Sequence, residues 1–240
     1  MTFPTDVSNE KSGNYHHGNL REVLIDIACA HIRDVGMEKL SLRAIAKDAG
    51  VSANAPYRHF PDKRSLLIAI AIAGFEQMAE AMHHVDERAL PILEEMRLKG
   101  RAYIHFATTH PEKYKLMFGP AISERTESME LMIAAGTSYE LLLKTVRKGI
   151  ETGIFRNAEV RSLADPIWAQ IHGISSLLID GFFNHDVQNF RTAWSQQGQN
   201  LPCPLTFACE HSLEETLDNF FNASILGIAS EQTRKDHTCR

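Results

Sequence analysis

Apolar residues recur at helical spacing along most of the chain. The first such run begins at about Asn19 and stops at Gly36, and another extends from Lys63 to about Met82. Further helical stretches are predicted near 86–109, 112–118, 123–152, 162–183 and 211–229. No segment shows the alternation of apolar and polar residues that is typical of a strand. The pattern therefore predicts an all-α fold.

A helix of about two turns and a tight turn are predicted after the first helix. Ser41 has the side chain of an N-cap, and the apolar residues that follow it keep helical spacing up to Gly50. A helix-turn-helix needs a small residue where its helices cross, a tight turn and an apolar residue that locks the second helix. Ala46, Gly50 and Val51 stand in those places. An ordinary pair of helices joined by a glycine turn has the same pattern, so these positions alone leave DNA binding open.

A third short helix is predicted directly after this turn. Ser52 is placed to cap it, and it would run to about His59, before Pro61 and Asp62 end it and cap a fourth helix. Pro56 would then be the fourth helical residue, where a proline removes only the first intrahelical hydrogen bond. Three short helices followed by a longer one predict a small N-terminal domain joined by a linking helix to a larger helical body.

Composition divides the chain into segments. We expect a disordered tail over 1–14, a helix-turn-helix domain over 15–64, a regulatory and dimerisation domain over 65–229 and a second disordered tail over 230–240. Within the larger domain, residues 184–210 are rich in Asn, Gln and Ser and contain two prolines, which predicts a loop insertion.

Charge is unevenly distributed along the chain. The formal net charge is −5, which argues against a uniformly basic nucleic-acid binder. Residues 40–64, however, hold five Lys and Arg against two Asp. A locally basic module on an acidic body fits phosphate contact by that module alone.

Several classes of protein are disfavoured by the sequence. There is no run of 18 apolar residues and no apolar segment near the N-terminus, so we expect no membrane span, no signal peptide and a cytoplasmic location. Four scattered cysteines do not form a disulfide framework. Cys203, Cys209 and His211 lack zinc-finger spacing and an evident fourth ligand, so no metal and no cofactor are expected.

The basic module resembles a known family. Residues 40–67, and above all Tyr57-x-His59-Phe60-x-x-Lys63 followed by Leu66-Leu67, resemble the DNA-binding domain of the TetR (tetracycline-repressor) family. The segment 15–21 and the Gly36 that ends the first helix are also similar. The resemblance implies a DNA-binding transcriptional regulator, most often a repressor that a small-molecule ligand releases from a palindromic operator.

Two segments of the larger domain resemble one branch of that family. They are 110–119 and Ile171-His172-Gly173, which is similar to a Trp-His-Gly motif of the ligand domain. Ile171 stands where the motif has Trp, and Trp168 lies three residues earlier. The implied partners are double-stranded operator DNA, a small-molecule effector and a second copy of the chain, and no membrane.

The third helix is interpreted as the recognition helix, because short polar side chains and methyl groups can reach base edges in a major groove. The predicted DNA-binding residues are Arg43, Ser52, Ala53, Asn54, Ala55, Tyr57, Arg58, His59 and Lys63. Arg43 could reach a phosphate or a guanine, and Lys63 is expected at a phosphate. Alternatives remain: Ser52 and Asn54 as capping residues, Tyr57 packed on the first helix, His59 packed beside Phe60, and Arg58 facing solvent.

Aromatic, methionine and histidine residues of the larger domain suggest a ligand pocket, although such residues at helical spacing are more often plain core. The candidate ligand-binding residues are His105, Phe106, Tyr114, Met117, Phe118, Met132, Tyr139, Trp168 and His172. Each histidine is about as compatible with a hydrogen-bonded place in the core.

A helix that is apolar on two sides must be covered twice, and 162–183 is such a helix. We therefore expect it to form, with the last helix, a homodimer interface that is a four-helix bundle across a two-fold axis. The predicted interface residues are Ile167, Ile171, Ile174, Leu178, Phe182, Leu217, Phe220 and Phe221.

The competing interpretation is a helical dimeric enzyme, or an interaction protein without operator binding. The sequence has no Gly-rich phosphate loop, no Gly-x-Ser-x-Gly and no His-Glu-x-x-His. Glu140 and Asp180 could form a carboxylate pair, but nothing in the sequence brings them together. We therefore do not expect an enzyme.

Overall fold

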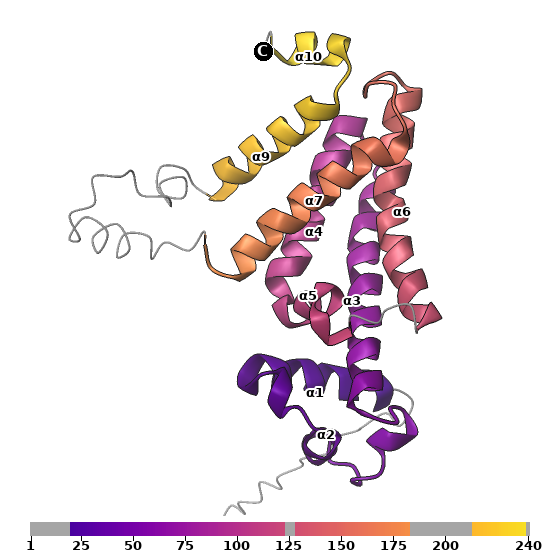
Figure 1. Ribbon diagram of the computed structural model, residues 1–240, viewed down its shortest axis with the longest axis vertical. Coiled ribbons are helices and arrows are strands. Elements are labelled where there is room, and N and C mark those ends of the chain that lie inside the picture. The colour runs from indigo at the N-terminus through magenta and orange to yellow at the C-terminus, as the bar shows by residue number, and fades with distance from the viewer. Residues whose placement is uncertain (1–19, 123–127, 183–212, 239–240) are drawn as a thin grey trace, which may run out of the picture. The chain divides into compact units, whose positions relative to one another are not determined.

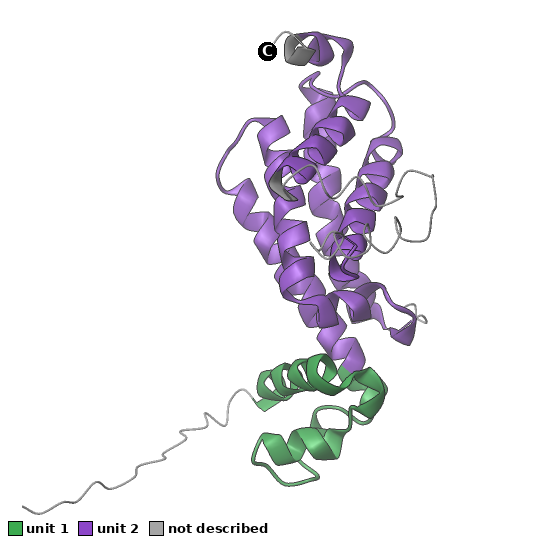
Figure 2. Cartoon of the chain, turned by 90° about the vertical axis from the view of Figure 1, so that its left-hand side faces the viewer, with its two compact units in different colours: residues 1–66 green, residues 67–240 purple. Residues whose placement is uncertain are grey.

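The computed structural model describes residues 20–122, 128–182 and 213–238. Apart from one isolated β-bridge, the regular structure of these residues is helical, which confirms the all-α prediction. The chain forms two compact units, Met1–Leu66 and Leu67–Arg240 (Figure 2). The predicted tail 1–14 and the predicted insertion 184–210 lie outside the described residues.

The first unit is built from short helices around one small core. Its elements are α1 (Leu20–Val35), the 3₁₀ turn η1 (Met37–Lys39), α2 (Leu42–Asp48), the 3₁₀ turn η2 (Pro56–Arg58) and the start of α3 (Lys63–Asp86). Ser41 caps α2 as predicted, because its Oγ accepts the Ala44 N–H at 3.2 Å. Gly36 and Gly50, at φ +84° and +66°, take the left-handed conformation that the ends of α1 and α2 require.

The third helix is not an α-helix, and this part of the prediction is wrong. Residues 53–55 form a hydrogen-bonded turn, and Pro56–Arg58 follow as one 3₁₀ turn whose first residue is the proline. Pro56 has no N–H to bond to the Ser52 carbonyl, so the first hydrogen bond of an α-helix capped by Ser52 cannot form. The Ala55 N–H instead bonds to the Ser52 carbonyl at 2.9 Å, and the His59 N–H to the Pro56 carbonyl at 3.0 Å.

Asp62 caps α3 as predicted. Its Oδ1 accepts the Ser65 N–H at 2.7 Å, and this backbone hydrogen bond is the main reason that the pKa of the Asp62 carboxyl lies below its ordinary value. By length and composition α3 could cross a membrane, but 56% of its most apolar stretch is buried inside the protein. A core helix of this kind accounts for the apolar composition.

The second unit is a bundle of longer helices. After α3 come α4 (Ile92–Thr109), α5 (Pro111–Phe118), the 3₁₀ turn η3 (Pro120–Ile122), α6 (Met129–Glu151), α7 (Val160–Ile179), α9 (Leu213–Ile228) and α10 (Glu231–Thr238). Figure 1 shows α7 lying across α4, and α7 also contacts α6 and α9. The helix α10 occupies most of the predicted tail 230–240, so the expectation of a disordered C-terminal segment there is corrected.

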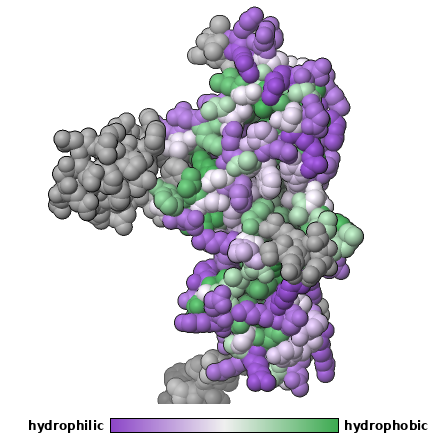
Figure 3. All heavy atoms as spheres, viewed as in Figure 1, coloured by the Kyte–Doolittle hydropathy of each residue, from purple (hydrophilic) through white to green (hydrophobic). Residues whose placement is uncertain are grey.

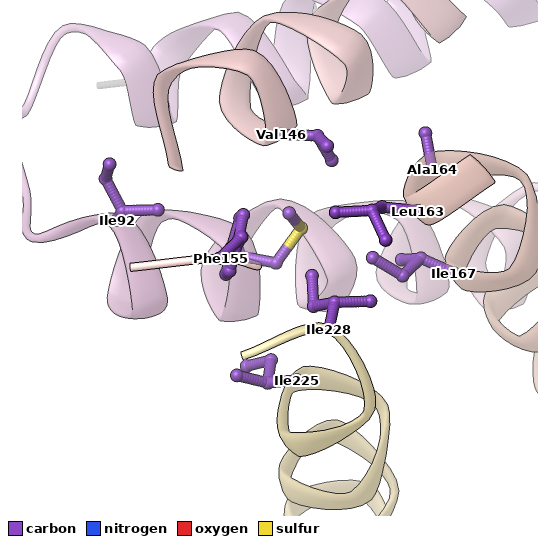
Figure 4. Close-up of a cluster of buried hydrophobic side chains, with 9 residues drawn as sticks. Ile92, Val146, Phe155, Leu163, Ala164, Ile167, Ile225 and Ile228 are labelled. Atoms are coloured by element: carbon purple, nitrogen blue, oxygen red, sulfur yellow. The ribbon is translucent and has the colours of Figure 1, made fainter. Parts of the chain in front are cut away.

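One end of this bundle encloses a cluster of buried apolar side chains (Figure 4). The cluster consists of Ile92, Met96, Val146, Phe155, Leu163, Ala164, Ile167, Ile225 and Ile228. Phe155 comes from the loop after α6, and its backbone pairs with Ala229 in the β-bridge. A Cβ on Gly149 would lie 2.1 Å from the Phe155 ring, so only glycine lets the ring pack directly against α6. The bridge and this ring fasten the α6–α7 loop to the end of α9.

A buried ion cluster joins three helices of the same unit. The Lys99 ammonium group on α4 forms ion pairs with Asp86, the last residue of α3, and with Glu95 at 3.1 Å. It also donates to the Thr145 hydroxyl on α6 at 2.7 Å. Lys148 reaches Glu95 from the surface at 3.1 Å. Each of the three charged groups at the centre is less than a tenth exposed, so each depends on its partners.

The cluster lowers the pKa values of its carboxyls. Burial acts to raise the pKa of Asp86 and of Glu95. Hydrogen bonds and positive charge from the surrounding lysines outweigh this effect at both carboxyls, and a hydrogen bond from Thr145 adds to them at Glu95. Both pKa values therefore lie below their ordinary range. A lowered pKa in the folded state stabilises the fold above the unfolded-state pKa of about 4, and this stabilisation is lost as the pH falls through the folded-state value.

We predict that Lys99→Met lowers the free energy of unfolding by about 3–5 kcal/mol at neutral pH, because it leaves buried carboxylates without their central cation. The variant should also lose less stability on acidification than the unchanged chain, since its carboxyl pKa values are less depressed. Urea unfolding followed by circular dichroism at neutral and acidic pH measures both effects.

Arg147→Met is the matched control. It removes an exposed pair with Glu140, and such pairs contribute about 0–1 kcal/mol. Equal losses from both variants would mean that the buried cluster stabilises the protein no more than a surface pair does.

Candidate DNA-binding surface and ligand cavity

The segment between α2 and α3 presents polar side chains above two buried anchors. Pro56 is buried and Phe60 is 1% exposed, so the segment is held from below. Ser52, Ala53 and Asn54 are exposed, as are Tyr57, Arg58 and His59, and Ala55 is half-buried. We call Ser52–His59 the recognition turn. A hydroxyl, an amide, a phenol and methyl groups lie within eight residues here, and these groups can read base edges.

Two of the alternatives for this turn can be compared with the structure. Tyr57 is 43% exposed, so it is not packed away on α1. His59 is exposed, and its ring centroid lies 6.2 Å from that of Phe60 in a tilted arrangement. Arg21 also lies over the Phe60 ring, with its guanidinium carbon 5.6 Å from the ring centroid. Both Tyr57 and His59 are therefore accessible to a ligand.

The two predicted phosphate contacts differ in their surroundings. Arg43 is exposed in the first turn of α2. Lys63 is half-buried, and its Nζ donates to the carbonyl oxygen of Glu38 at 3.2 Å, which ties the η1 turn to the start of α3. Another tie that the sequence did not indicate joins α1 to α2, where His31 Nε2 lies 2.5 Å from Asp48 Oδ2. Both ties join residues distant in sequence, and periodicity carries no signal for them.

Four of the predicted ligand residues form a contiguous aromatic group between α5 and α7. The Phe118 ring centroid lies 4.9 Å from Tyr114, 4.6 Å from His172 and 6.4 Å from Trp168. Tyr139 on α6 extends the group, with its ring 5.8 Å from Trp168. The structure therefore brings five of the nine predicted ligand residues together.

Hydrogen bonds link this group to Tyr103, which the sequence analysis did not select. Tyr114 Oη lies 2.6 Å from His172 Nδ1 and 3.2 Å from Tyr103 Oη. Burial raises the pKa of Tyr114 to about 12 and raises that of Tyr103 further, so both phenols are protonated at neutral pH. Tyr114 can then donate to a neutral His172 ring. Helical spacing gave no signal for Tyr103, because Phe106, the predicted ligand residue one turn away on the same helix, does not belong to this group.

A cavity of about 50 Å³ lies at the centre of the second unit. Its lining residues are Met82, Met96, Lys99, Gly100, Tyr103, Ser138, Tyr139, Leu142, Ile167, Trp168, Ile171, Phe220, Phe221, Ser224 and Ile225. Tyr139 and Trp168 belong to the predicted ligand set. A more open hollow of about 180 Å³ is lined by Tyr114, Phe118 and His172 together with Lys115, Gly119, Ser176, Ile179 and Asp180.

The remaining ligand predictions lie elsewhere. His105 and Met132 are exposed and line neither hollow, so the structure does not support their assignment to a pocket. Their helical positions face solvent, which apolar spacing alone did not show. Phe106 and Met117 are buried in the core outside both linings. Met117 packs on α3, where a Cβ on Gly74 would lie 2.6 Å from its sulfur.

The predicted dimer interface needs a larger correction. Ile167, Ile171, Ile174, Leu217 and Phe221 are each at most 8% exposed within a single chain, so they belong to its own core. Leu178 and Phe220 are half-buried, and Phe182 is 50% exposed. The apolar stripe of α7 faces α4, α6 and α9 of the same chain, with which this helix is in contact. Periodicity showed that the stripe is buried but not which helices cover it.

Other apolar groups on α7 and α9 do reach the surface. Leu177 is 43% exposed and Leu226 is 37% exposed. Gly173 and Gly227 also point outward, because a Cβ on either would meet nothing within 4 Å. Figure 3 shows hydrophobic patches interrupted by polar ones on the side that carries these two helices.

No metal site is found among the described residues, where no group of three or more His, Cys, Asp and Glu side chains could hold an ion. Cys203, Cys209 and His211 lie outside the described residues. The described Cys29 is buried and forms no disulfide.

Two family models match the chain. One, described as bacterial regulatory proteins of the tetR family, matches residues 24–70, and the other, described as the tetracyclin repressor-like C-terminal domain, matches residues 96–197. Together they cover more than half of the chain. The first includes the recognition turn, and the second includes most of the cavity lining.

Individual proteins similar to the chain include the nucleoid occlusion factor SlmA of Vibrio vulnificus, which is 23% identical over 185 residues, 74% of this chain and 93% of that protein. The HTH-type transcriptional regulator Rv1816 of Mycobacterium tuberculosis is 25% identical over 101 residues, 41% of this chain and 43% of that protein.

Among solved structures, a protein of unknown function from Rhodococcus sp. RHA1 is similar with a TM-score of 0.66 and 26% identity, covering 91% of this chain and all of that one. The TetR family transcriptional regulator PfmR from Thermus thermophilus has a TM-score of 0.55 and 20% identity, covering 64% of this chain and 84% of that one. The second likeness supports the fold alone.

We predict that Tyr114→Phe lowers the free energy of unfolding by about 1–2 kcal/mol, because it removes the hydroxyl 2.6 Å from His172 Nδ1 and 3.2 Å from Tyr103 Oη and leaves these two groups a longer mutual contact of 3.4 Å. Urea unfolding at neutral pH measures the loss. Tyr139→Phe is the control, since the hydroxyl of Tyr139 bonds to the exposed Asp165 and water can replace it there. A loss no larger than that of the control would show that the Tyr114 hydroxyl is not needed to hold His172.

Proposed function

The chain belongs to the TetR family of DNA-binding transcription regulators, and we propose that it acts as a homodimeric repressor that a small molecule releases from a palindromic operator. The exposure of the polar recognition turn, held above the buried Pro56 and Phe60, is the observation that carries the proposal. The repressor sense and the release by a ligand follow from the family resemblance.

In this proposal the recognition turn enters the major groove. Ser52, Asn54 and Tyr57 make hydrogen bonds to base edges, and Ala53 and Ala55 offer methyl groups to thymine. Arg43, Arg58, His59 and Lys63 contact phosphates and set the orientation of the module on the duplex. Lys63 has a second role, because its bond to the Glu38 carbonyl holds the N-terminal end of α3.

Dimerisation would use the outward faces of α7 and α9. Leu177 and Leu226 supply exposed apolar surface, and the open positions Gly173 and Gly227 let the helices of a second copy approach closely. Two copies related by a two-fold axis would present two recognition turns to half-sites about 34 Å apart, or a multiple of that distance. An enzyme, or an interaction protein that does not bind an operator, would lack specific binding to such a site.

We predict that Asn54→Ala or Tyr57→Ala weakens binding to the specific operator by about 1–3 kcal/mol and hardly affects random DNA, because these side chains read bases. Lys63→Met should weaken binding to both DNAs and reduce the salt slope by about one. Fluorescence anisotropy at several salt concentrations, with a site selected from genomic fragments and its scrambled sequence, measures both effects.

Asn157→Ala, at an exposed position in the α6–α7 loop, is the matched control and should change neither affinity. If Asn54→Ala reduced binding to both DNAs equally, the recognition turn would not be the reader. If Lys63→Met lowered the stability of the protein but left the salt slope unchanged, Lys63 would have only its structural role, the bond to the Glu38 carbonyl.

We predict that Gly173→Arg converts the dimer to a monomer and weakens operator binding with it. A Cβ at this position would meet no other atom within 4 Å, so the substitution causes no clash at its first side-chain atom, and the long arginine side chain would block the close approach of a second α7. Sedimentation velocity and the anisotropy assay measure the two effects.

Gly136→Arg on α6 makes the same change at another open helical position and is expected to stay dimeric. Gly136 lies beside a second exposed apolar patch formed by Met129, Met132 and Ile133. If Gly136→Arg dissociated the dimer and Gly173→Arg did not, α6 rather than α7 would form the interface.

A further inference from the structure

The cavity between the helices of the second unit is lined mainly by apolar side chains and is partly open to the surface. Each of the helices α3, α4, α6, α7 and α9 contributes to its wall. Gly100 of α4 lies in this wall, and a Cβ there would meet the Phe221 ring at 2.3 Å and Ile171 at 2.7 Å. The helices are therefore packed tightly around the space, and the properties of its lining decide what can enter.

Among the described residues that line the cavity, Lys99 is the one charged residue, and its charge is already matched. Its ammonium group has ion-pair contacts with Asp86 and Glu95, and it donates to the Thr145 hydroxyl at 2.7 Å and to the Leu141 carbonyl at 3.3 Å. An ammonium group has three hydrogens, so no donor is left for a ligand. An anion in the cavity would find no free positive charge, and a cation would meet the buried Lys99.

The hydroxyl groups of the lining are also engaged within the chain. Ser138 Oγ donates to the Ala135 carbonyl at 2.9 Å, and Ser224 Oγ lies 2.6 Å from Gln170 Oε1. Tyr139 donates to Asp165, and Tyr103 lies in the group with Tyr114 and His172. A polar ligand would have to give up its hydrogen bonds to water without an equal return, which is unfavourable.

We infer that this cavity binds an uncharged, mainly apolar molecule about the size of a single aromatic ring. The inference rests on the proposed function, because it names the chemical class of the effector. At about 50 Å³ the cavity is smaller than the apolar cavity of about 150 Å³ that holds benzene in another protein. Met82 and Met96 line it, and their flexible thioether side chains can move aside for a ring.

The lining also connects the ligand to α3. Met82 is a residue of α3, one turn before Asp86, whose carboxylate is held by Lys99. A ring that displaces Met82 acts on the helix that begins at Lys63, shortly after the recognition turn. Occupancy of the cavity can therefore change the preferred position of α3, which is how the effector would lower operator affinity.

Three probes with the same ring and different charge test the inference: toluene, benzoate and benzylammonium. Calorimetric titration of the full-length dimer at neutral pH, without DNA, measures binding. Toluene should bind with one site per chain, and each charged probe should bind at least about tenfold more weakly, because its charge has no partner in the cavity.

Two serine variants locate the site. Ser138→Leu fills the cavity and should abolish toluene binding, whereas the control Ser176→Leu alters the neighbouring hollow and should leave binding unchanged. Met96→Ala enlarges the cavity and should retain or strengthen toluene binding, which provides an independent test if Ser138→Leu does not fold.

Benzoate or benzylammonium binding as tightly as toluene would overturn the uncharged class. Absence of toluene binding to both the unchanged chain and Met96→Ala, or binding that survives in folded Ser138→Leu, would overturn the cavity as the site. Operator titration with toluene tests the proposed function separately. Toluene that binds but shifts operator affinity by less than about twofold, below ordinary coupling, would refute release by this ligand and leave the cavity assignment intact.

Discussion

The second unit depends on one buried cation. Lys99 joins the end of α3, through Asp86, to Glu95 on its own helix and to Thr145 on α6. Apolar contacts are not directional and tolerate small displacements along a helix axis, whereas a buried ion pair does not. Shifting any of the three helices by one turn would leave a charge without its partner inside the protein. The register of the bundle is therefore fixed at this point.

The same cation determines the character of the cavity beside it. Because its positive charge is balanced and its hydrogens are used, this lysine attracts no ionic ligand into the cavity. The cavity then excludes a charged molecule because such a molecule loses its hydration on entry and gains no charged partner in return. A lysine in a pocket is often interpreted as an anion site. Here its four partners within the chain argue the opposite.

The sequence predicted local features well and long-range partners poorly. The Ser41 cap, the glycine at position 50 and the Asp62 cap depend on neighbouring residues, and the structure has them. The bonds of Lys63 to Glu38 and of Lys99 to Thr145 join residues far apart along the chain, for which spacing gives no indication.

The helix α7 shows the same limit for burial. Its spacing indicated two apolar sides, but a stripe that faces its own bundle and one that faces a second copy look identical in sequence. The stripe with Ile167, Ile171 and Ile174 covers the core of the chain. Gly173 of the same helix is the place that we propose for contact with a second copy, and only the structure shows that a Cβ there would meet nothing within 4 Å.

The recognition turn shows how buried residues determine what their neighbours can do. Pro56 and Phe60 are four residues apart, and the Phe60 N–H bonds to the Pro56 carbonyl at 2.9 Å, so both lie on one side of a single helical turn. With both side chains in the core, the residues between them must face outward. The exposure of Tyr57 is thus a consequence of two apolar anchors, and an aromatic side chain held at the surface in this way is available to the groove of a duplex. The proline that removes the first hydrogen bond of an α-helix here is itself one of the two anchors that hold the exposed polar side chains outward.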